Sequence, residues 1–223
     1  MMNTFDFSKV KQQLASLDTA SICDTNKALR VIDPAIRPVR KGMKLIGVAH
    51  TVRCEDDFLT VMRALKDAKE NEVLVIDTQN SKRAVTGELF SSEAARKKLA
   101  GIIIDGACRD TEKIRSLPIP VYCRHTYPIS GTVTKIFETQ VPVRCGGAIV
   151  NPGDVVFGDS DGVIVASIEE MTKAIPIAQE IQIKETQILA RLDKGESLFD
   201  MLNFDEHYKQ IRNGSGSTLK FTA

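Results

Sequence analysis

Glu88 and the pair Arg109-Asp110 are the residues of this chain whose types and spacing could do chemistry. Twenty residues, 89 to 108, separate the first acid from the arginine. The intervening sequence reads as a helix that starts at a glycine turn near Gly87, followed by a buried strand that ends at the Arg-Asp pair. Because ligands in open α/β sheets bind at the carboxyl ends of strands, we expect the three side chains to share a site.

This set of residues could bind an anion and a cation together. Gly87 lets a ligand approach the backbone closely, and the free amides at the start of the helix attract a carboxylate or a phosphate. Arg109 offers a planar fork to the same anion, or to an oxygen that becomes negative during a reaction. Asp110 offers a hard oxygen ligand to a divalent metal, and Glu88 offers a second one. The pattern is typical of a water-rich Mg²⁺ site.

Structural interpretations compete with this functional one. An Arg-Asp pair alone is usually a surface ion pair, but the spacing and the flanking glycines favour a functional role for Arg109 and Asp110. An acid in the first turn of a helix is favoured by the helix dipole, so Glu88 also fits a structural role. Cys108 is interpreted as a packing residue, and the pair Gly146-Gly147 is too short for a nucleotide-binding loop.

The remaining polar candidates favour structural roles. His50 lies in a β-rich segment and is interpreted as a core or sheet histidine, while His125 and His207 have no partners at metal-ligand spacing. Three aspartates occur in turn sequences, where this residue type commonly binds the backbone. They are Asp154, Asp159 and Asp161.

Composition restricts the class of protein. The 223 residues are 43% hydrophobic, and 30 Lys and Arg against 29 Asp and Glu give a net charge of +1. A net charge this close to zero produces no overall positive electrostatic field that would attract nucleic acid or an anionic membrane. The five cysteines form no Cys-x-x-Cys pair, and the first residues lack a cationic start and an apolar core. We therefore expect reduced thiols, a cytoplasmic location and no membrane insertion.

The first half of the chain alternates helical and strand patterns. Helical spacing occurs over residues 7–30, 58–65 and 87–99, and β-rich segments cover 44–53, 73–77 and 102–104. The short apolar runs 73–77 and 102–104 are typical of strands that are buried on both faces.

The second half is β-rich and then helical. Strands are expected within 121–123, 131–139, 141–150, 154–157 and 163–166. A long charged helix follows from Ile168 to about Lys194, with Gly195 as its C-cap. We predict one α/β domain over residues 1–223, with a core at about 21–166. The C-terminal helical arm, at about 168–205, would lie over a neighbouring subunit.

Several segments resemble one protein family. They are the strand 45–52, the segment 72–77, the block 101–110 and the run from Val143 to Val165 that includes Asn151-Pro152-Gly153-Asp154. The family contains the regulator of RNase E activity A (RraA) and the 4-hydroxy-4-methyl-2-oxoglutarate (HMG/CHA) aldolases. The aldolase signature is an acid, twenty residues and Arg-Asp, which here is Glu88 and Arg109-Asp110 with Glu in place of the usual Asp. The extra methylene moves the carboxylate by about one bond length, which a water-bridged metal contact absorbs.

The resemblance implies an RraA-like layered α/β/β/α sandwich, of the swivelling β/β/α type, and a class II pyruvate aldolase. In that class a divalent cation, Mg²⁺ or Mn²⁺, chelates a 2-oxo acid. Asp110 would bind the metal directly and Glu88 through water, while Arg109 stabilises the pyruvate enolate. The amides of Gly87, Glu88, Leu89 and Phe90 would hold the substrate carboxylate. Cleavage of 4-hydroxy-2-oxo acids and decarboxylation of oxaloacetate yield the same enolate.

The resemblance also implies a homotrimer or a dimer of trimers, in which an acid from the adjacent subunit completes the site. Glu185 is the first candidate for that acid and Glu180 the second, because the helix register stays open. Two alternatives remain. One is a non-catalytic regulator of the RNase E type that binds a protein partner, although that protein lacks the upstream acid. The other is a different enzyme on the same scaffold, acting on another oxo acid or a phosphate ester.

Overall fold

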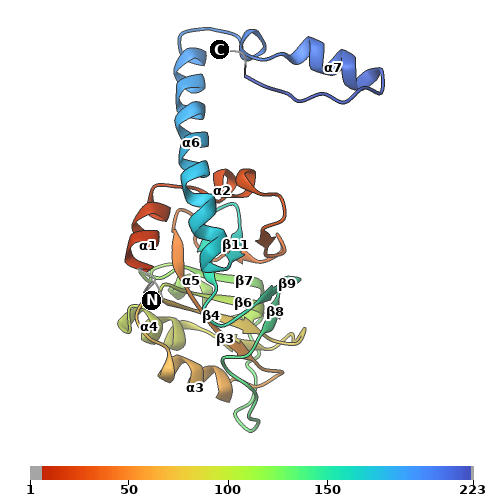
Figure 1. The fold of residues 1–223 in the computed structure, drawn as a ribbon. Helices are drawn as coiled ribbons and strands as arrows, with labels where there is room; N and C mark the ends of the chain where they lie inside the picture. Colours follow the sequence, from red (N-terminus) through yellow and green to blue (C-terminus); the bar gives the residue numbers. More distant parts are fainter. Residues whose placement is uncertain (1–6, 222–223) are drawn as a thin grey trace, which may run out of the picture. The chain divides into compact units, whose positions relative to one another are not determined.

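A mixed sheet of nine strands forms the centre of the chain (Figure 1). The computed structural model describes residues 7–221. The strands of this sheet are β1 (Arg30–Val31), β2 (Arg37–Pro38), β3 (Leu45–Arg53), β4 (Glu72–Asp77), β5 (Ala84–Thr86), β6 (Gly101–Cys108), β7 (Val121–Thr126), β10 (Val155–Gly158) and β11 (Val163–Ala166). Their order is β1-β11-β10-β3-β4-β6-β7-β2, and β5 pairs with β6 beside this path.

The middle of the sheet is parallel. Strands β3, β4, β6 and β7 run in one direction, with Val75 opposite Ile103 and Ile103 opposite Tyr122. Every residue of β4 after Glu72 is buried, as is nearly all of β6. The prediction that the apolar runs at 73–77 and 102–104 are strands covered on both faces is confirmed.

Helices cover one face of the parallel strands. Helix α3 (Leu59–Asp67) and helix α4 (Glu88–Arg96) lie side by side in Figure 1, and the short α5 (Thr111–Ile114) follows β6. Their apolar side chains, such as Val61, Ala94 and Ile114, pack against Leu74 and Ile104 of the sheet. The other face of these strands is covered by a two-stranded sheet, β8 (Val143–Cys145) and β9 (Ala148–Val150).

A third core cluster lies against β10 and β11. It contains residues of α1 (Phe7–Ala15), α2 (Thr19–Thr25) and the start of α6 (Ile168–Leu192). Four separate helices occur at the predicted helical segments 7–30, 58–65 and 87–99, and α6 begins where the sequence places the long helix. The end of the first segment is wrong, because α2 stops at Thr25 and Arg30 already belongs to β1. Gly195, at φ +87°, follows its end and has the left-handed conformation that a C-cap glycine adopts.

The predicted strand at 131–139 is wrong. This segment makes only isolated bridges, Asp57 with Thr132 and Val52 with Thr139. The amides of Gly131 and Thr132 donate to separate backbone carbonyls, those of Ala84 and Asp56. Further along, Thr134 and Lys135 donate to the carboxylate of Asp57, and Phe137 donates to the hydroxyl of Thr60. These scattered acceptors replace the neighbouring strand that a ladder would need.

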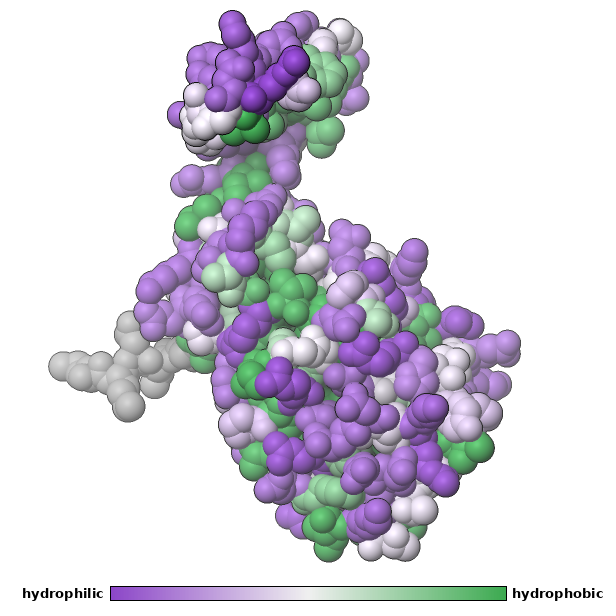
Figure 2. Space-filling model, turned by 90° about the vertical axis from the view of Figure 1, so that its right-hand side faces the viewer, coloured by the Kyte–Doolittle hydropathy of each residue, from purple (hydrophilic) through white to green (hydrophobic). Residues whose placement is uncertain are grey.

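The contacts divide the chain into two compact units, Met1–Ala178 and Gln179–Ala223. The second unit contains the end of α6, a short 3-10 helix η1 (Leu198–Met201) and α7 (Phe204–Arg212). The Phe199 and Phe204 rings lie 5.3 Å apart, and Met201 is buried. Hydrophobic side chains, green in Figure 2, also reach the surface of this unit. Among residues 7–221, no helix has the length and apolar character to cross a membrane.

Candidate functional site

Strand pairing brings the two halves of the sequence motif together. Strand β5 runs parallel to β6 with Thr86 opposite Cys108. Gly87 and Arg109 are the residues that directly follow this pair, so they also lie next to each other. The amide of Arg109 donates to the carbonyl of Thr86 at 3.1 Å. Gly87 is then the N-cap of α4, whose first residue is Glu88. The residues at the two ends of the twenty-residue spacing, Glu88 and Arg109, therefore lie close together, as the sequence predicted.

Asp110 turns its carboxylate back towards the start of α4. Its φ of 58° is left-handed, a region that Asp tolerates better than most residues, and it is the N-cap of α5. Its Oδ2 accepts a hydrogen bond from the backbone nitrogen of Glu88 at 3.2 Å and lies 3.7 Å from Nε of Arg109. One carboxylate thus contacts both the helix start and the guanidinium.

Gly87 is required by this close approach rather than by its own backbone angles. Its φ of −162° is extended and open to any residue. A Cβ at this position would lie 2.5 Å from Oδ2 of Asp110 and 3.2 Å from Cγ of Arg109. Any side chain here would displace the carboxylate from the helix start.

Several polar groups around this carboxylate are open to a ligand. Within residues 7–221, no protein group bonds Oδ1 of Asp110 or the terminal nitrogens of Arg109, and both side chains are 43% exposed. The first-turn amides of Leu89 and Phe90 have no acceptor within their own helix. An anion and a cation could therefore bind side by side.

These residues line a cavity of about 420 Å³, within the range of small-molecule sites. Phe58 and Ser130 also line it, and sequence reasoning missed both. The rings of Phe58 and Phe90 meet edge to face at 5.7 Å. Ser130 arrives through a long-range bridge to Ala84 that no local pattern signals. The lining residues are Phe58, Ala84, Val85, Thr86, Gly87, Glu88, Leu89, Phe90, Arg109, Asp110 and Ser130.

The residues present fit a hydrated divalent cation. Within residues 7–221, no group of three or more His, Cys, Asp or Glu side chains could hold a metal ion. Asp110 and Glu88 offer two carboxylates at one cavity, with Oδ1 of Asp110 unbonded. Mg²⁺ keeps several waters and commonly takes only one or two protein carboxylates, so this donor set suits it.

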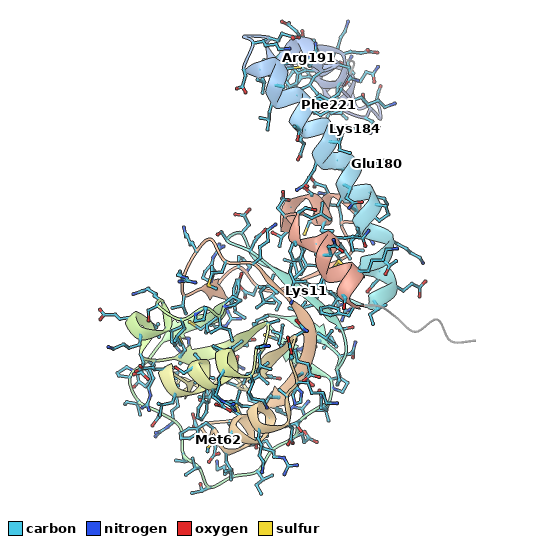
Figure 3. All side chains as sticks on the ribbon, turned by 90° about the vertical axis from the view of Figure 1, so that its left-hand side faces the viewer. Lys11, Met62, Glu180, Lys184, Arg191 and Phe221 are labelled. Atoms are coloured by element: carbon cyan, nitrogen blue, oxygen red, sulfur yellow. The ribbon has the colours of Figure 1, made fainter. Side chains whose placement is uncertain are left out.

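The two C-terminal acids belong to the second unit. Glu180 and Glu185 both lie on α6 and are exposed, and Figure 3 labels Glu180 with Lys184 one turn further along. Their role at the site of a neighbouring subunit stays a prediction.

Other polar candidates have structural partners. His50 is buried, and its Nδ1 lies 2.9 Å from Glu72. Asp154 pairs with Arg30 at 2.7 Å, and Asp159 accepts hydrogen bonds from Thr19. The structural interpretations of these three residues are confirmed. Within the described chain, His125 and His207 belong to no candidate metal cluster.

Comparison with known proteins identifies the family. The model of the RraA-like family (Aldolase/RraA) matches residues 19–165. An uncharacterized protein of Methanocaldococcus jannaschii is 34% identical, with 86% of this chain and 93% of that protein covered. A protein of Halalkalibacterium halodurans named "Putative 4-hydroxy-4-methyl-2-oxoglutarate aldolase" is 34% identical, with 69% and 74% covered.

A solved structure supports the same assignment. The RNA-processing inhibitor RraA from Thermus thermophilis is 26% identical, with a TM-score of 0.63 over 67% of this chain and 92% of that one. The expected α/β fold with a long C-terminal helix is thereby confirmed. On its sequence and its fold, this chain belongs to the RraA-like family.

Proposed function

We propose that this protein is a divalent-metal-dependent carbon–carbon lyase that releases pyruvate from 4-hydroxy-2-oxo acids such as 4-hydroxy-4-methyl-2-oxoglutarate. Oxaloacetate decarboxylation would occur at the same site. The observation that carries the proposal is the convergence of Gly87, Glu88, Arg109 and Asp110 on one cavity. Relatives named as aldolases of this substrate support it.

Asp110 and Glu88 would hold the cation, with Oδ1 of Asp110 as a direct ligand and Glu88 acting through water. Mg²⁺ or Mn²⁺ bound there would act as a Lewis acid on the 2-oxo group of the substrate. Gly87 keeps the space that the Asp110 carboxylate needs.

The substrate carboxylate would bind at the start of α4. Leu89 and Phe90 line the cavity, their first-turn amides have no acceptor within the helix, and the helix dipole adds a favourable positive potential. In the structure the neighbouring amide of Glu88 is bonded to Asp110. It becomes available to the substrate only when that carboxylate turns towards the cation.

Arg109 would stabilise the negative charge that develops on the 2-oxo oxygen when the carbon–carbon bond breaks. Its terminal nitrogens have no partner among residues 7–221. They can therefore bind the substrate oxygen without first breaking an ion pair within the protein. Preorganised donors of this kind contribute most in a site from which water is partly excluded. Phe58 and Phe90 provide the apolar wall.

The test is pyruvate release from oxaloacetate and from 4-hydroxy-4-methyl-2-oxoglutarate by the purified full chain. We expect turnover with Mg²⁺ or Mn²⁺ well above the metal-only background, and its loss in EDTA. Turnover that EDTA leaves unchanged would exclude the metal role. No turnover of either substrate would exclude the lyase.

An acid from a neighbouring subunit would complete the site in a homotrimer or a dimer of trimers. Glu185→Gln should then lower turnover more than Glu180→Gln. Because the substituted chain donates its acid to another subunit, mixing it with Asp110→Asn chains should restore part of the activity. Sedimentation should give three or six copies.

A second candidate function is a non-catalytic regulator that binds a protein partner. The similarity to the RNA-processing inhibitor RraA from Thermus thermophilis favours it. Glu88 at the cavity favours the lyase instead, since a docking surface needs no paired carboxylates beside a free guanidinium. Absent turnover together with tight binding to an RNase E type enzyme would support the regulator.

A further inference from the structure

Cys108 and Cys123 form a pair of thiols that the proposed reaction does not use. They lie on the adjacent parallel strands β6 and β7, and their sulfur atoms are 3.2 Å apart. A disulfide bond is about 2.05 Å long, so the two sulfur atoms must approach by about an ångström. Cys108 lies opposite Thr126 rather than Cys123, so the strands must also shift slightly for the bond to form. Both side chains belong to the core between the sheet and the helices.

The two thiols differ in access. Cys108 is fully buried, whereas Cys123 is 7% exposed and lines a cavity of about 450 Å³. Arg37, Arg115 and Arg124 line the same cavity, and none of its lining residues is acidic. A small neutral or anionic oxidant can therefore reach Cys123 but not Cys108.

Together with its greater access, the hydrogen bond between the thiols favours Cys123 as the nucleophile. The Cys108 thiol donates to the sulfur of Cys123, and this lowers the pKa of Cys123 although burial raises it. Other thiols lack such a donor. Burial raises the pKa of Cys54 to about 12 and that of Cys145 well above its usual value. The thiolate is the reactive form of cysteine, so reactivity should concentrate at Cys123.

We propose that Cys123 and Cys108 are a hydroperoxide-reactive dithiol, with Cys123 attacking the oxidant and Cys108 resolving the product into a disulfide. In the first step a Cys123 sulfur–oxygen bond forms and the peroxide oxygen–oxygen bond breaks. The alkoxide or hydroxide leaves and takes up the thiol proton. Cys108 then attacks the Cys123 sulfur, a sulfur–sulfur bond forms, and water leaves with the second proton. Two thiols are oxidised and one hydroperoxide is reduced to an alcohol or to water.

The position of Cys108 links this chemistry to the candidate site. Arg109 and Asp110 follow it directly, at the end of β6. Drawing the Cys108 sulfur towards β7 displaces the chain that carries both side chains. Displacements of about 1 Å at an active site can cost about 100-fold in rate, so the disulfide form should be a much weaker lyase. This consequence rests on the proposed function, whereas the disulfide itself does not.

The first test is covalent. The reduced full chain is treated with hydrogen peroxide, and the remaining thiols are then alkylated and counted by intact mass spectrometry. We expect the five free thiols to fall to three. Trypsin should yield a reducible crosslink between peptides 99–109 and 116–124, each with its cysteine next to the terminal arginine. Oxidation that leaves these peptides unlinked would overturn the proposal.

Variants separate the two roles. Cys108→Ser should leave a sulfenic acid on Cys123 that dimedone traps, while Cys123→Ser should leave Cys108 unmodified. Cys23→Ser is the matched control, because it removes a partly exposed thiol outside the pair and should leave the crosslink unchanged. A dimedone adduct on Cys108 in the Cys123→Ser chain would reverse the assignment.

The second test measures pyruvate release before and after peroxide. We expect the wild-type rate to fall about 100-fold and to recover with dithiothreitol, while Cys123→Ser stays insensitive. A crosslinked chain with full activity would remove the link to the site and keep the dithiol. A reduced chain without activity would remove the proposed lyase and leave the mass result standing.

Discussion

The carboxylate of Asp110 accepts a hydrogen bond from the backbone nitrogen of Glu88 at 3.2 Å. The residue assigned to the cation therefore also caps the helix assigned to the substrate anion. A cation that draws Asp110 away would release one more first-turn donor for the anion. Metal and substrate should consequently bind with positive cooperativity, because each favours the same displacement of one carboxylate.

Gly87→Ala tests this arrangement. The new methyl group would lie 2.5 Å from Oδ2 of Asp110 and 3.2 Å from Cγ of Arg109, so it would occupy the space of both side chains and push them out of the positions from which they bind a ligand. We expect kcat/KM to fall by about 100-fold, as for other displacements of about 1 Å in active sites. Gly162→Ala is the control, since its Cβ would meet nothing within 4 Å. Equal activity of the two variants would contradict the importance of the close approach.

Arg109→Ala should affect chemistry far more than folding. The side chain is 43% exposed and its recorded ionic contact is the 3.7 Å approach to Asp110, so the melting temperature should change little. Loss of one charge-stabilising donor typically lowers kcat by about 100- to 1,000-fold. Arg96→Ala, which removes an exposed arginine of α4 paired with Glu93, should keep full turnover. Near-normal turnover of Arg109→Ala would remove the assigned role.

Asp110→Asn separates charge from shape. The amide oxygen can still accept from the nitrogen of Glu88, so the start of α4 should stay intact. The lost negative charge should weaken Mn²⁺ binding and abolish activation by Mg²⁺. Calorimetric titration with Mn²⁺ measures the first effect, and the oxaloacetate assay measures the second. Unchanged Mn²⁺ affinity would place the cation elsewhere.

The parts of the fold that the sequence predicts well are those fixed by local pattern. The apolar runs of β4 and β6 are typical of strands in the middle of a covered sheet, and both strands are buried there. The site motif follows from the same logic, because Gly87 begins a helix and Arg109 follows a strand. Parallel pairing of β5 with β6 then joins them.

The parts that the sequence does not predict depend on distant partners. Residues 131–139 have a β-rich composition, yet the amides of Thr134, Lys135 and Phe137 donate to the side chains of Asp57 and Thr60, which lie more than seventy positions earlier. Ser130 reaches the cavity for the same reason, through its bridge to Ala84. Long-range acceptors of this kind leave no periodic signal in the sequence.

Asp57 connects two segments that line the cavity. It is fully buried, and its carboxylate accepts hydrogen bonds from the amide of Leu59 at the start of α3 and from the segment at 132–135. Burial raises its pKa, but these hydrogen bonds lower it by more, so the net shift is downward. Asp57 therefore joins Phe58 and α3 to the loop that carries Ser130.

Asp57→Asn should unfold more easily than the wild type. An amide cannot replace all of these acceptors, and each buried donor left unpaired costs about 1–3 kcal/mol, so we expect a loss of about 2–4 kcal/mol at neutral pH. Urea denaturation measures the loss. Asp161→Asn, a substitution of an exposed aspartate, is the control and should be neutral.

The pH dependence of the unfolding free energy tests whether the ionised Asp57 carboxylate stabilises the folded state. The folded pKa of Asp57 lies below its unfolded value of about 3.9, so its contribution is fully present above that value. This stabilisation is lost as the pH falls through the folded pKa, because Asp57 is then protonated in the folded state as well as in the unfolded state. The difference in unfolding free energy between wild type and Asp57→Asn should therefore be constant from about pH 6 to pH 8 and shrink below about pH 4. A difference that stays constant down to about pH 2 would show that the carboxylate charge contributes nothing.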